Sequence, residues 1–423
     1  MTSRARPGCN KMGRLIASGR YLAWCVPILA EAAALARSIA FAWAIGPEEL
    51  GRAMMLALTI RLVEMASDLG LERLIVQAPD GNSAELQAGL QGTAIVRGLF
   101  AGLVVLGLAP VLAGLFSDGP DAMSYAALAA IPLIRSFAHL DFRRAERQLA
   151  YRKMAIVEGG ATVGMVLGMA PAMWVFADHR AMSLVLIAHA ATFTVLSHCV
   201  AERRYRLGLS LAILQRSWRF GAPLVLNALL LFVTFYADRL IVAGAYSWSA
   251  LALYGVALQL ALLPAQIVGR AAASLVLPVL REALLGKEFD MVWRRVLATH
   301  AVLACGMTVG FSLIAPPVIA LVYGAGFRPD IFLALALAVA AACRILRTPF
   351  SQLAIAMGRT GDPARANVIR AAALVPAAFF ASAGLPLATI AAAAALGEAG
   401  ATFRAYRLAA GTTLRTSMNE VCA

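Results

Sequence analysis

The stretch of sequence from Leu99 to Phe116 reads LFAGLVVLGLAPVLAGLF, 18 residues without a charged side chain. Similar uncharged runs extend from Leu333 to Cys343 and from Ala371 to Gly397. A soluble core helix would carry a polar stripe at a period of 3.6 residues, and these runs carry none. Because about 20 apolar residues cross a hydrocarbon core of about 30 Å, the runs predict helices that span a bilayer.

The composition of the whole chain also indicates a membrane protein. Of its 423 residues, 61% are hydrophobic and 14% are charged, whereas a soluble domain is about half apolar and about a quarter charged. We therefore predict an all-α integral membrane protein with about twelve transmembrane helices. The expected spans are residues 21–45, 51–76, 90–116, 123–142, 154–177, 182–200, 220–244, 251–280, 295–323, 331–352, 366–384 and 386–405.

The net charge of +14 comes almost entirely from arginine, with 34 Arg against 3 Lys. In a soluble protein this excess would suggest nucleic acid as a partner. Here the basic residues lie between apolar runs, and cytoplasmic loops of membrane proteins collect Lys and Arg. We therefore expect the membrane, and no nucleic acid, as the partner of these charges.

The basic residues also predict the topology. With twelve spans and both termini inside, the cytoplasmic pieces hold 25 Lys and Arg, and the outer loops hold three, Arg52, Arg180 and Arg328. An error of one span would place basic loops on both sides, so the asymmetry favours twelve spans with both termini cytoplasmic. Five basic residues precede Tyr21 without a small-residue cleavage signal after them, so we expect an uncleaved first helix.

The two halves of the chain resemble each other. Ile134-Arg135-Ser136 matches Leu346-Arg347-Thr348 at an offset of 212 residues. Six spans per half would give two parallel lobes with a substrate site between them, near the midplane of the membrane. The basic, leucine-rich segment between the halves is expected to lie on the inner membrane surface. We predict an N-terminal lobe at 1–200, a cytoplasmic amphipathic linker at 201–219 and a C-terminal lobe at 220–423.

Charged side chains inside the spans are the candidates for function, because an arginine or aspartate at the bilayer centre costs about 2.5–3.5 kcal/mol. Such residues normally face a bundle interior or an aqueous cavity. Arginine binds phosphate and carboxylate through a planar fork of donors, so an excess of arginine favours an anionic substrate. The substrate-binding candidates are Arg37, Arg61, Arg135, Arg239, Arg270 and Arg344, and the candidates for ion coupling are Glu31, Glu64, Asp68 and Asp238.

The pattern Arg61, Glu64 and Asp68 places three charges on one face of the second span. It allows two interpretations. Either Arg61 and Glu64 form an internal salt bridge while Asp68 caps a turn near Gly70, or the face is a polar wall of a transport cavity. Arg61 lies too deep in its span to reach water along the helix, whereas Arg270 lies near the cytoplasmic end and could do so.

The sequence indicates no cofactor, metal site or disulfide. The six cysteines include no CxxC pair, and the histidines include no HxxxH. Cys25, Cys199, Cys305 and Cys343 fall in apolar segments, where cysteine is usually a small hydrophobe. A membrane enzyme, such as a polysaccharide polymerase or ligase, is not expected, because the outer loops are short and no nucleophile–base set is visible.

Several short motifs resemble those of a known family. They are IGPEELG at 45–51, DLGL at 68–71 and Gln77 in the first half, and FGAP at 220–223, Asp238-Arg239, Tyr254-Gly255, Pro264 and Pro278 in the second. In order and spacing the chain is similar to the polysaccharide flippases, which move lipid-linked oligosaccharides across bacterial inner membranes. These belong to the multidrug/oligosaccharidyl-lipid/polysaccharide exporter superfamily, together with the lipid II flippases and the multidrug and toxin extrusion exporters.

The resemblance implies a V-shaped pair of six-helix lobes around a central cationic cavity, which accepts the diphosphate and sugar of a polyprenyl lipid. In the lipid II relatives, arginines of spans 1, 2 and 8 line that cavity, and Arg37, Arg61 and Arg270 occupy those spans here. Those relatives carry two further C-terminal helices that this sequence lacks, which favours the oligosaccharide branch.

The expected function is therefore translocation of polyprenyl-diphosphate-linked oligosaccharide across the inner membrane by alternating access, for lipopolysaccharide or exopolysaccharide synthesis. Expected partners are this lipid, membrane lipids, and the polysaccharide polymerase and chain-length machinery. The alternatives are a multidrug or cation exporter of the same fold, which should have acidic rather than basic cavity residues, and a lipid II flippase. A major facilitator protein would carry a basic loop after its second span, and residues 78–90 contain no basic residue.

Overall fold

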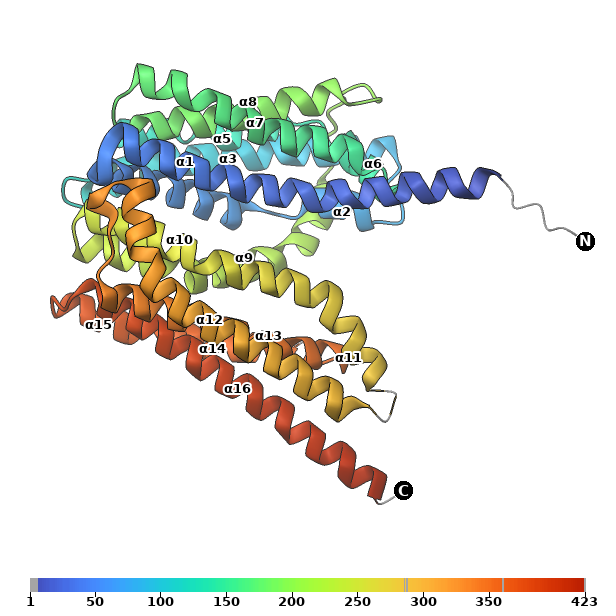
Figure 1. Ribbon diagram of the computed structural model, residues 1–423. Coiled ribbons are helices and arrows are strands. Elements are labelled where there is room, and N and C mark those ends of the chain that lie inside the picture. Colours follow the sequence, from blue (N-terminus) through green and yellow to red (C-terminus); the bar gives the residue numbers. More distant parts are fainter. Residues whose placement is uncertain (1–6, 285, 287, 360, 422–423) are drawn as a thin grey trace, which may run out of the picture. The chain divides into compact units, whose positions relative to one another are not determined.

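The computed structural model describes residues 7–284, 286, 288–359 and 361–421, and the side chains within 22, 25–284, 286, 288–359 and 361–410. Every regular element in these ranges is a helix, as expected (Figure 1). The elements are α1 Pro7–Ser67, α2 Leu71–Gln77, α3 Ala84–Leu115, α4 Ala122–Ala127, α5 Ala130–Ser136, α6 Asp141–Arg147, α7 Tyr151–Val175, α8 Arg180–Cys199, α9 Leu211–Ala245, α10 Trp248–Ala271, the π-helix η1 Ala272–Val276, α11 Leu277–Ala283, α12 Phe289–Tyr323, the 3-10 helix η2 Ala325–Phe327, α13 Ile331–Ala356, α14 Gly361–Ala372, α15 Leu374–Ser382 and α16 Leu387–Val421.

The helices are long and apolar enough for a multi-pass membrane protein. Nine helical segments among the described residues could cross a membrane, and ten could if the bent pair Ala122–Ser136 and Asp141–Arg147 forms one span. The first segment, Cys25–Ser67, has 43 residues, about 65 Å of helix and twice the hydrocarbon thickness. Dividing it at Gly46 adds one span, which makes up to eleven; α16 is not among the candidate spans, so twelve spans stay a prediction.

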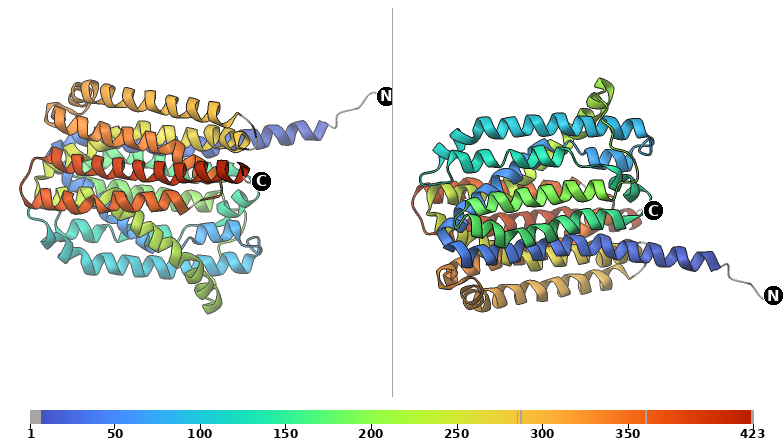
Figure 2. Two further views of the ribbon diagram at one scale, coloured as in Figure 1. Left: turned by 90° about the horizontal axis from the view of Figure 1, so that it is seen from below. Right: turned by 90° about the horizontal axis from the view of Figure 1, so that it is seen from above.

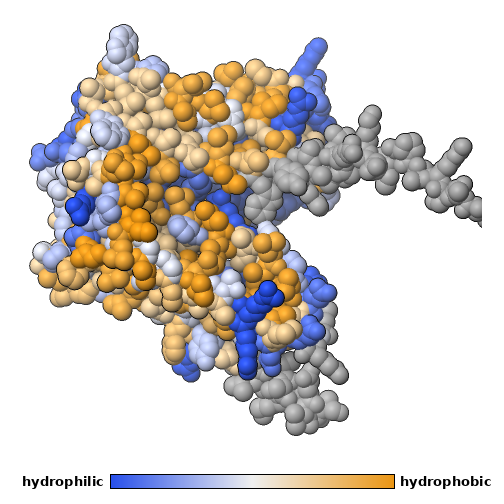
Figure 3. Space-filling view, in the orientation of Figure 1, coloured by the Kyte–Doolittle hydropathy of each residue, from blue (hydrophilic) through white to orange (hydrophobic). Residues whose placement is uncertain are grey.

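The outer surface of these helices is apolar, as contact with lipid requires. Trp174 is 88% exposed and Leu321 is 79% exposed. Figure 3 shows hydrophobic side chains over much of the visible face. Large exposed hydrophobic areas are rare on soluble monomers, so the surface supports the membrane assignment independently of the sequence runs.

Contacts divide the chain into two compact units, which we call unit 1 (Met1–Phe232) and unit 2 (Val233–Ala423). In unit 1, α7 packs against α8 and α1, and α5 packs against α3 and α8; α7 and α8 lie side by side in Figures 1 and 2. In unit 2, α13 packs against α16, α12 and α10. The division falls inside α9, so the boundaries at 200 and 219 stay predictions.

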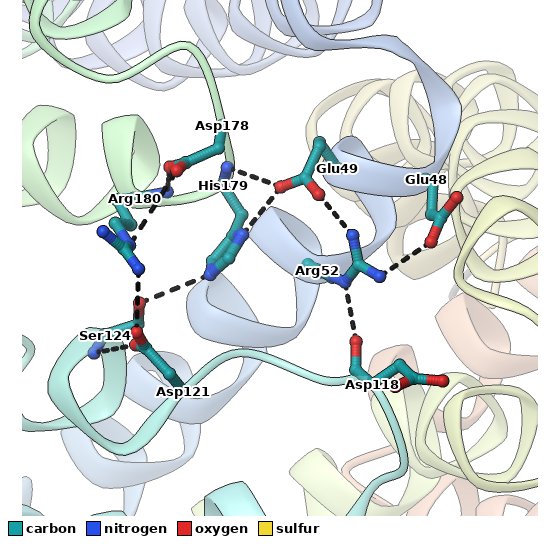
Figure 4. A network of polar contacts seen from close by, with 9 residues as sticks. All are labelled: Glu48, Glu49, Arg52, Asp118, Asp121, Ser124, Asp178, His179 and Arg180. Atoms are coloured by element: carbon teal, nitrogen blue, oxygen red, sulfur yellow. Dashed lines mark hydrogen bonds and ion pairs between the residues drawn. The ribbon is translucent and has the colours of Figure 1, made fainter.

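The IGPEELG motif produces the break in α1. Gly46 has φ 76° and ψ 177°, a conformation that favours glycine, and Pro47 starts the next helical stretch. Arg52, one turn later, donates hydrogen bonds to the carboxylates of Glu48, at 2.7 Å, and Glu49 (Figure 4). The motif therefore forms a tight corner between two helical stretches, and Arg52, directly after it, holds the corner through its two glutamates.

The same corner is tied to two other loops of unit 1 (Figure 4). Glu49 accepts hydrogen bonds from the backbone N–H of His179, at 2.9 Å, and pairs with its Nδ1 at 2.7 Å. Asp121 caps α4 by accepting from the Ser124 N–H, and it pairs with Arg180 at 2.9 Å. Hydrogen bonding by the side chain and the backbone N–H of Ser124 holds the pKa of the Asp121 carboxyl below its usual range.

Two of the family-like motifs meet in the interior of unit 1. A methyl group on Gly70, which has φ 64°, would lie 2.6 Å from a side-chain carbon of Leu224. A methyl group on Gly221 would lie 2.4 Å from the carbonyl oxygen of Leu69. The glycines of DLGL and FGAP are therefore needed for close approach of α9 to the end of α1.

The expected span at 123–142 is broken into α4, α5 and α6, with a bend of 57° before α6. Side chains distant in sequence replace helical hydrogen bonds at the break. Ser197 Oγ accepts from the His139 N–H at 2.8 Å, and Gln91 Oε1 accepts from the Leu140 N–H at 3.3 Å. Hydropathy carries no information on such contacts, so the sequence predicted a continuous helix.

The segment 201–219 contains an irregular part and the start of α9, which begins at Leu211. It is fastened to α3 and the loop before it. The Gly208 N–H donates to the Ala88 carbonyl at 3.0 Å, and Arg216 donates to both oxygens of Asp80 at 2.7 Å. Leu209 is 82% exposed, and Leu207 and Trp218 are also exposed, which agrees with an amphipathic segment.

Candidate functional site

A cavity of about 300 Å³ lies inside unit 1 between α1, α5, α7 and α8. Its wall is apolar except for six side chains. Three of those six are arginines that the sequence singled out, and both stretches of α1, before and after the break at Gly46, contribute to the wall. The polar lining residues are Arg37, Arg61, Glu64, Arg135, Thr162 and His189.

The three arginines of this cavity have little negative charge to neutralise them. Arg37 donates only to the sulfur of Met165, at 3.4 Å, and no carboxylate of the described residues pairs with it. The carboxylate of Glu64 lies 3.6 Å from Arg135 and 4.0 Å from Arg61. One acid therefore serves two guanidinium groups, and the third has none.

The geometry bears on the two interpretations of the Arg61 face. Its ion pair with Glu64 is at the limit of contact distance, and 54% of the Arg61 side chain is exposed. Arg135 is the nearer partner of Glu64, and its guanidinium also lies 4.4 Å from the Phe193 ring centroid. Arg61 is thus only weakly held by Glu64, as a ligand-binding side chain would be.

Two of the acids proposed for ion coupling lie elsewhere. Asp68 accepts a hydrogen bond from the Gly70 N–H at 2.9 Å and lies 4.0 Å from Arg97. It caps the turn between α1 and α2, as one of the two interpretations held. Glu31 lies on α1 but outside the cavity lining.

Unit 2 contains a second group of predicted residues. Asp238 accepts from the Tyr254 hydroxyl at 2.9 Å and from the Arg239 N–H at 2.8 Å. The side chain of Arg239 donates to the Phe235 carbonyl at 3.0 Å. The guanidinium of Arg344 lies 4.9 Å from the Phe235 ring centroid, within the range of a cation–π contact.

Two further arginines join this group around a buried glutamate. Glu398 is 4% exposed and pairs with Arg347 at 3.3 Å and Arg370 at 2.8 Å. Arg370 also lies 4.2 Å from the Phe235 ring centroid. The expected span 366–384 contained Arg370 without singling it out as a candidate; in the structure it lies on α14, within the candidate span Gly361–Ser382.

The remaining predicted substrate ligand of unit 2 is Arg270. It lies on α10 directly before η1, is exposed, and its carbonyl accepts from Ser274 at 3.2 Å. In the part of the chain that the structure describes, no three His, Cys, Asp or Glu side chains could hold a metal ion together. His189 was missed by the sequence analysis, because a histidine in an apolar helix carries no obligatory charge cost and therefore no signal.

The fold defines a class of protein. The chain is similar to a multidrug resistance MATE family transporter of the MOP superfamily in its inward-facing conformation, with 14% identity over 92% of this chain and 96% of that chain and a TM-score of 0.66. It is also similar to the lipid II flippase MurJ in an inward closed conformation, with 13% identity over 90% and 86% and a TM-score of 0.67. A MOP superfamily transporter from Pyrococcus furiosus shares 15% identity over 94% of each chain, with a TM-score of 0.51. The protein therefore has the fold of the MOP superfamily transporters.

The sequence places the chain more narrowly. Residues 41–331, more than half of the chain, match the family model of polysaccharide biosynthesis proteins, and the chain belongs to that family. This confirms the resemblance drawn from the motifs at 45–51, 68–71 and 220–223, and it confirms the all-α membrane transporter fold. No curated protein matches the chain. Family and fold together support a flippase or exporter of polysaccharide biosynthesis.

Proposed function

We propose that the protein is a flippase that moves a polyprenyl-diphosphate-linked oligosaccharide across the bacterial inner membrane by alternating access. The observation that carries the proposal is the cavity of unit 1, where Arg37, Arg61 and Arg135 stand against the single acid Glu64. Three guanidinium groups and one carboxylate leave two positive charges for a ligand to neutralise. A diphosphate diester carries two negative charges.

The chemistry of these side chains fits phosphate better than the alternatives. A guanidinium presents a planar fork of N–H donors that matches two phosphate oxygens, and it keeps its charge when desolvated. An exporter of organic cations needs the opposite charge on its cavity wall. The volume of about 300 Å³ is at the lower end of the range of small-molecule sites, about 300–1,000 Å³.

The apolar surface of the protein supports a lipid chain that stays in the bilayer. Exposed side chains such as Trp174 and Leu321 would face lipid on the outside of the helices, so a polyprenyl tail needs no protein pocket. The polar head would enter the cavity of unit 1. Arg239 and Arg344 of unit 2 stay predicted substrate ligands within their own unit. On the outer leaflet, the product would be consumed by a polymerase with its chain-length machinery.

The proposal includes the orientation in the membrane. Both termini and the segment 201–219 are proposed to be cytoplasmic, on the 25-to-3 distribution of Lys and Arg. Arg4, Arg6, Lys287 and the side chains of Lys11, Arg14, Arg20 and Arg415 contribute to that count and lie outside the described part of the structure. Reporter fusions after Arg219 and Arg415 test it, and periplasmic activity at either point would contradict twelve spans.

The function is tested in a deletion strain that has no second flippase. We expect polyprenyl-diphosphate oligosaccharide to accumulate on the inner leaflet and surface polysaccharide to fall. Re-expression of the natural chain should restore polysaccharide, and Arg61→Ala at matched expression should not. A deletion strain with normal polysaccharide and no lipid intermediate would show that the substrate is another one.

A further inference from the structure

His189 lies on the wall of the unit 1 cavity, and its ring makes no hydrogen bond within the described ranges. It is half-buried on α8, and its ring faces the same space as Arg37, Arg61 and Arg135. No group within the described ranges hydrogen-bonds to the ring, although His139, His179, His198 and His300 of the same chain each have such a partner. A polar ring that is left unsatisfied in a polar cavity is available to a ligand or a proton.

The charges around the ring set the conditions under which it can take up a proton. From α1 the cavity receives Arg37, Arg61 and Glu64, from α5 it receives Arg135, and the lining residues of α7 are Thr162 and Met165, which do not titrate. The empty cavity therefore has two positive charges in excess. An imidazolium would add a third, and like charges within a low-dielectric site disfavour the charged form.

A bound diphosphate reverses this balance. As a diester, it keeps two negative charges throughout the neutral range, because it lacks the second ionisation, near pH 6, of a phosphate monoester. These charges cancel the excess of the arginines and attract a further cation. We propose that His189 accepts one proton, donated by the aqueous buffer, when the diphosphate enters, so that proton and anion are bound together.

This inference rests on the proposed function and adds a coupling to it. Linkage is reciprocal, so a proton that is taken up on binding must also strengthen binding. If one proton is taken up per ligand, the dissociation constant falls by up to tenfold for each unit of decreasing pH near neutrality. Among the described lining residues of the cavity, Glu64 is the other candidate for the proton.

The experiment uses the full-length protein in lipid nanodiscs and farnesyl-diphosphate-linked N-acetylglucosamine as the probe. Calorimetric titrations at several pH values between 5.5 and 8, in buffers of different ionisation enthalpy, report both affinity and protons exchanged. We expect uptake approaching one proton per ligand for the natural chain. His189→Gln should bind the probe with the affinity that the natural chain has at the highest pH, with no uptake and no pH dependence.

The matched control is His198→Gln, on the same helix and outside the cavity lining, which should keep the proton uptake. Binding without proton uptake in the natural chain, or uptake that persists in His189→Gln, would overturn the role of His189 and leave the flippase proposal standing. Uptake that is lost in Glu64→Gln but kept in His189→Gln would assign the proton to Glu64. A natural chain that fails to bind the probe would overturn the proposed function itself.

Discussion

The carboxylate of Glu64 on α1 lies 3.6 Å from the guanidinium of Arg135 on α5, closer than it lies to Arg61, one helical turn away on its own helix. The pairing across two helices fixes Arg135 in the cavity wall. It leaves Arg61 with a contact of 4.0 Å and a largely exposed side chain. A pattern that suggests a local salt bridge in the sequence thus becomes mainly a tertiary ion pair, with Arg61 at a longer distance from the same carboxylate.

The first prediction concerns Arg61. If Arg61 only neutralised Glu64, the double change Arg61→Ala with Glu64→Ala would be tolerated, because an apolar pair can replace an ion pair at little cost. We expect the double variant to lose transport, because a phosphate ligand of the cavity is gone. Arg61→Lys should keep partial activity, since lysine retains the charge but loses the two-pronged geometry. Surface polysaccharide at matched expression measures each outcome.

Arg281→Ala is the control for these arginine variants. Arg281 lies exposed on α11, and its removal should leave polysaccharide unchanged. A fully active double variant would make Arg61 a structural residue and would move the substrate site toward Arg37 and Arg135.

A second prediction concerns the stability of unit 2. Glu398 is buried and is shared by Arg347 and Arg370. Glu398→Ala leaves two guanidinium groups without their carboxylate, and breaking a buried pair in this way costs about 3–5 kcal/mol. We expect a marked fall in the midpoint of thermal unfolding of the purified protein. Glu282→Ala, at an exposed position on α11, should leave the midpoint unchanged, and equal midpoints for both variants would contradict the structure.

The cavity arginines could be predicted from the sequence because a charged side chain within a membrane span costs free energy. A charge such as Arg37 or Arg135 in an apolar run must find a partner or water, so depth in the span is a sufficient signal. The same rule did not single out Arg370, because the expected span 366–384 places it in the first turn of its helix, whereas the structure starts α14 at Gly361 and pairs Arg370 with Glu398. Helix boundaries depend on tertiary contacts that no local pattern contains.

The glycine motifs show the same limit. DLGL and FGAP could be recognised as family-like, but their contact in space could not be derived from two motifs that begin 152 positions apart in the chain, at residues 68 and 220. In the structure, Gly221 approaches the backbone of Leu69. The two motifs therefore form a single packing contact, and the need for glycine at both places can be seen only in the folded protein.

The third prediction tests that packing. In Gly221→Ala the new methyl group would lie 2.4 Å from the Leu69 carbonyl oxygen and 2.6 Å from its Cα, and backbone atoms cannot move aside as a flexible side chain can. Overpacking of this kind costs about 1–3 kcal/mol, so we expect a lower unfolding midpoint. Gly306→Ala, with no atom within 4 Å of the added carbon, should be neutral or stabilising. Similar losses in both variants would argue against close contact at Gly221.

The fourth prediction concerns the ion pair that fastens the start of α9 to the loop before α3. The two hydrogen bonds from Arg216 hold the pKa of Asp80 below its usual range. A depressed pKa in the folded state means that the pair stabilises the protein above the unfolded pKa, about 3.9, and that this contribution disappears as pH falls through the folded value. Both side chains are more than a third exposed, so solvent screening limits the effect to about 1 kcal/mol or less.

Arg216→Ala should therefore lower the unfolding midpoint slightly at pH 7, and the difference from the natural chain should shrink steadily below pH 4, as Asp80 takes up its proton in both proteins. Asp80→Asn should cause a similar small loss at pH 7, and the double variant should lose little more than either single one, since both act through the same pair. Arg204→Ala, which removes a charge from the same segment where no ion pair involves it in the described structure, is the control. A difference between Arg216→Ala and the natural chain that stays constant down to pH 3, or single losses that add fully, would show that Arg216 stabilises α9 by packing rather than through Asp80.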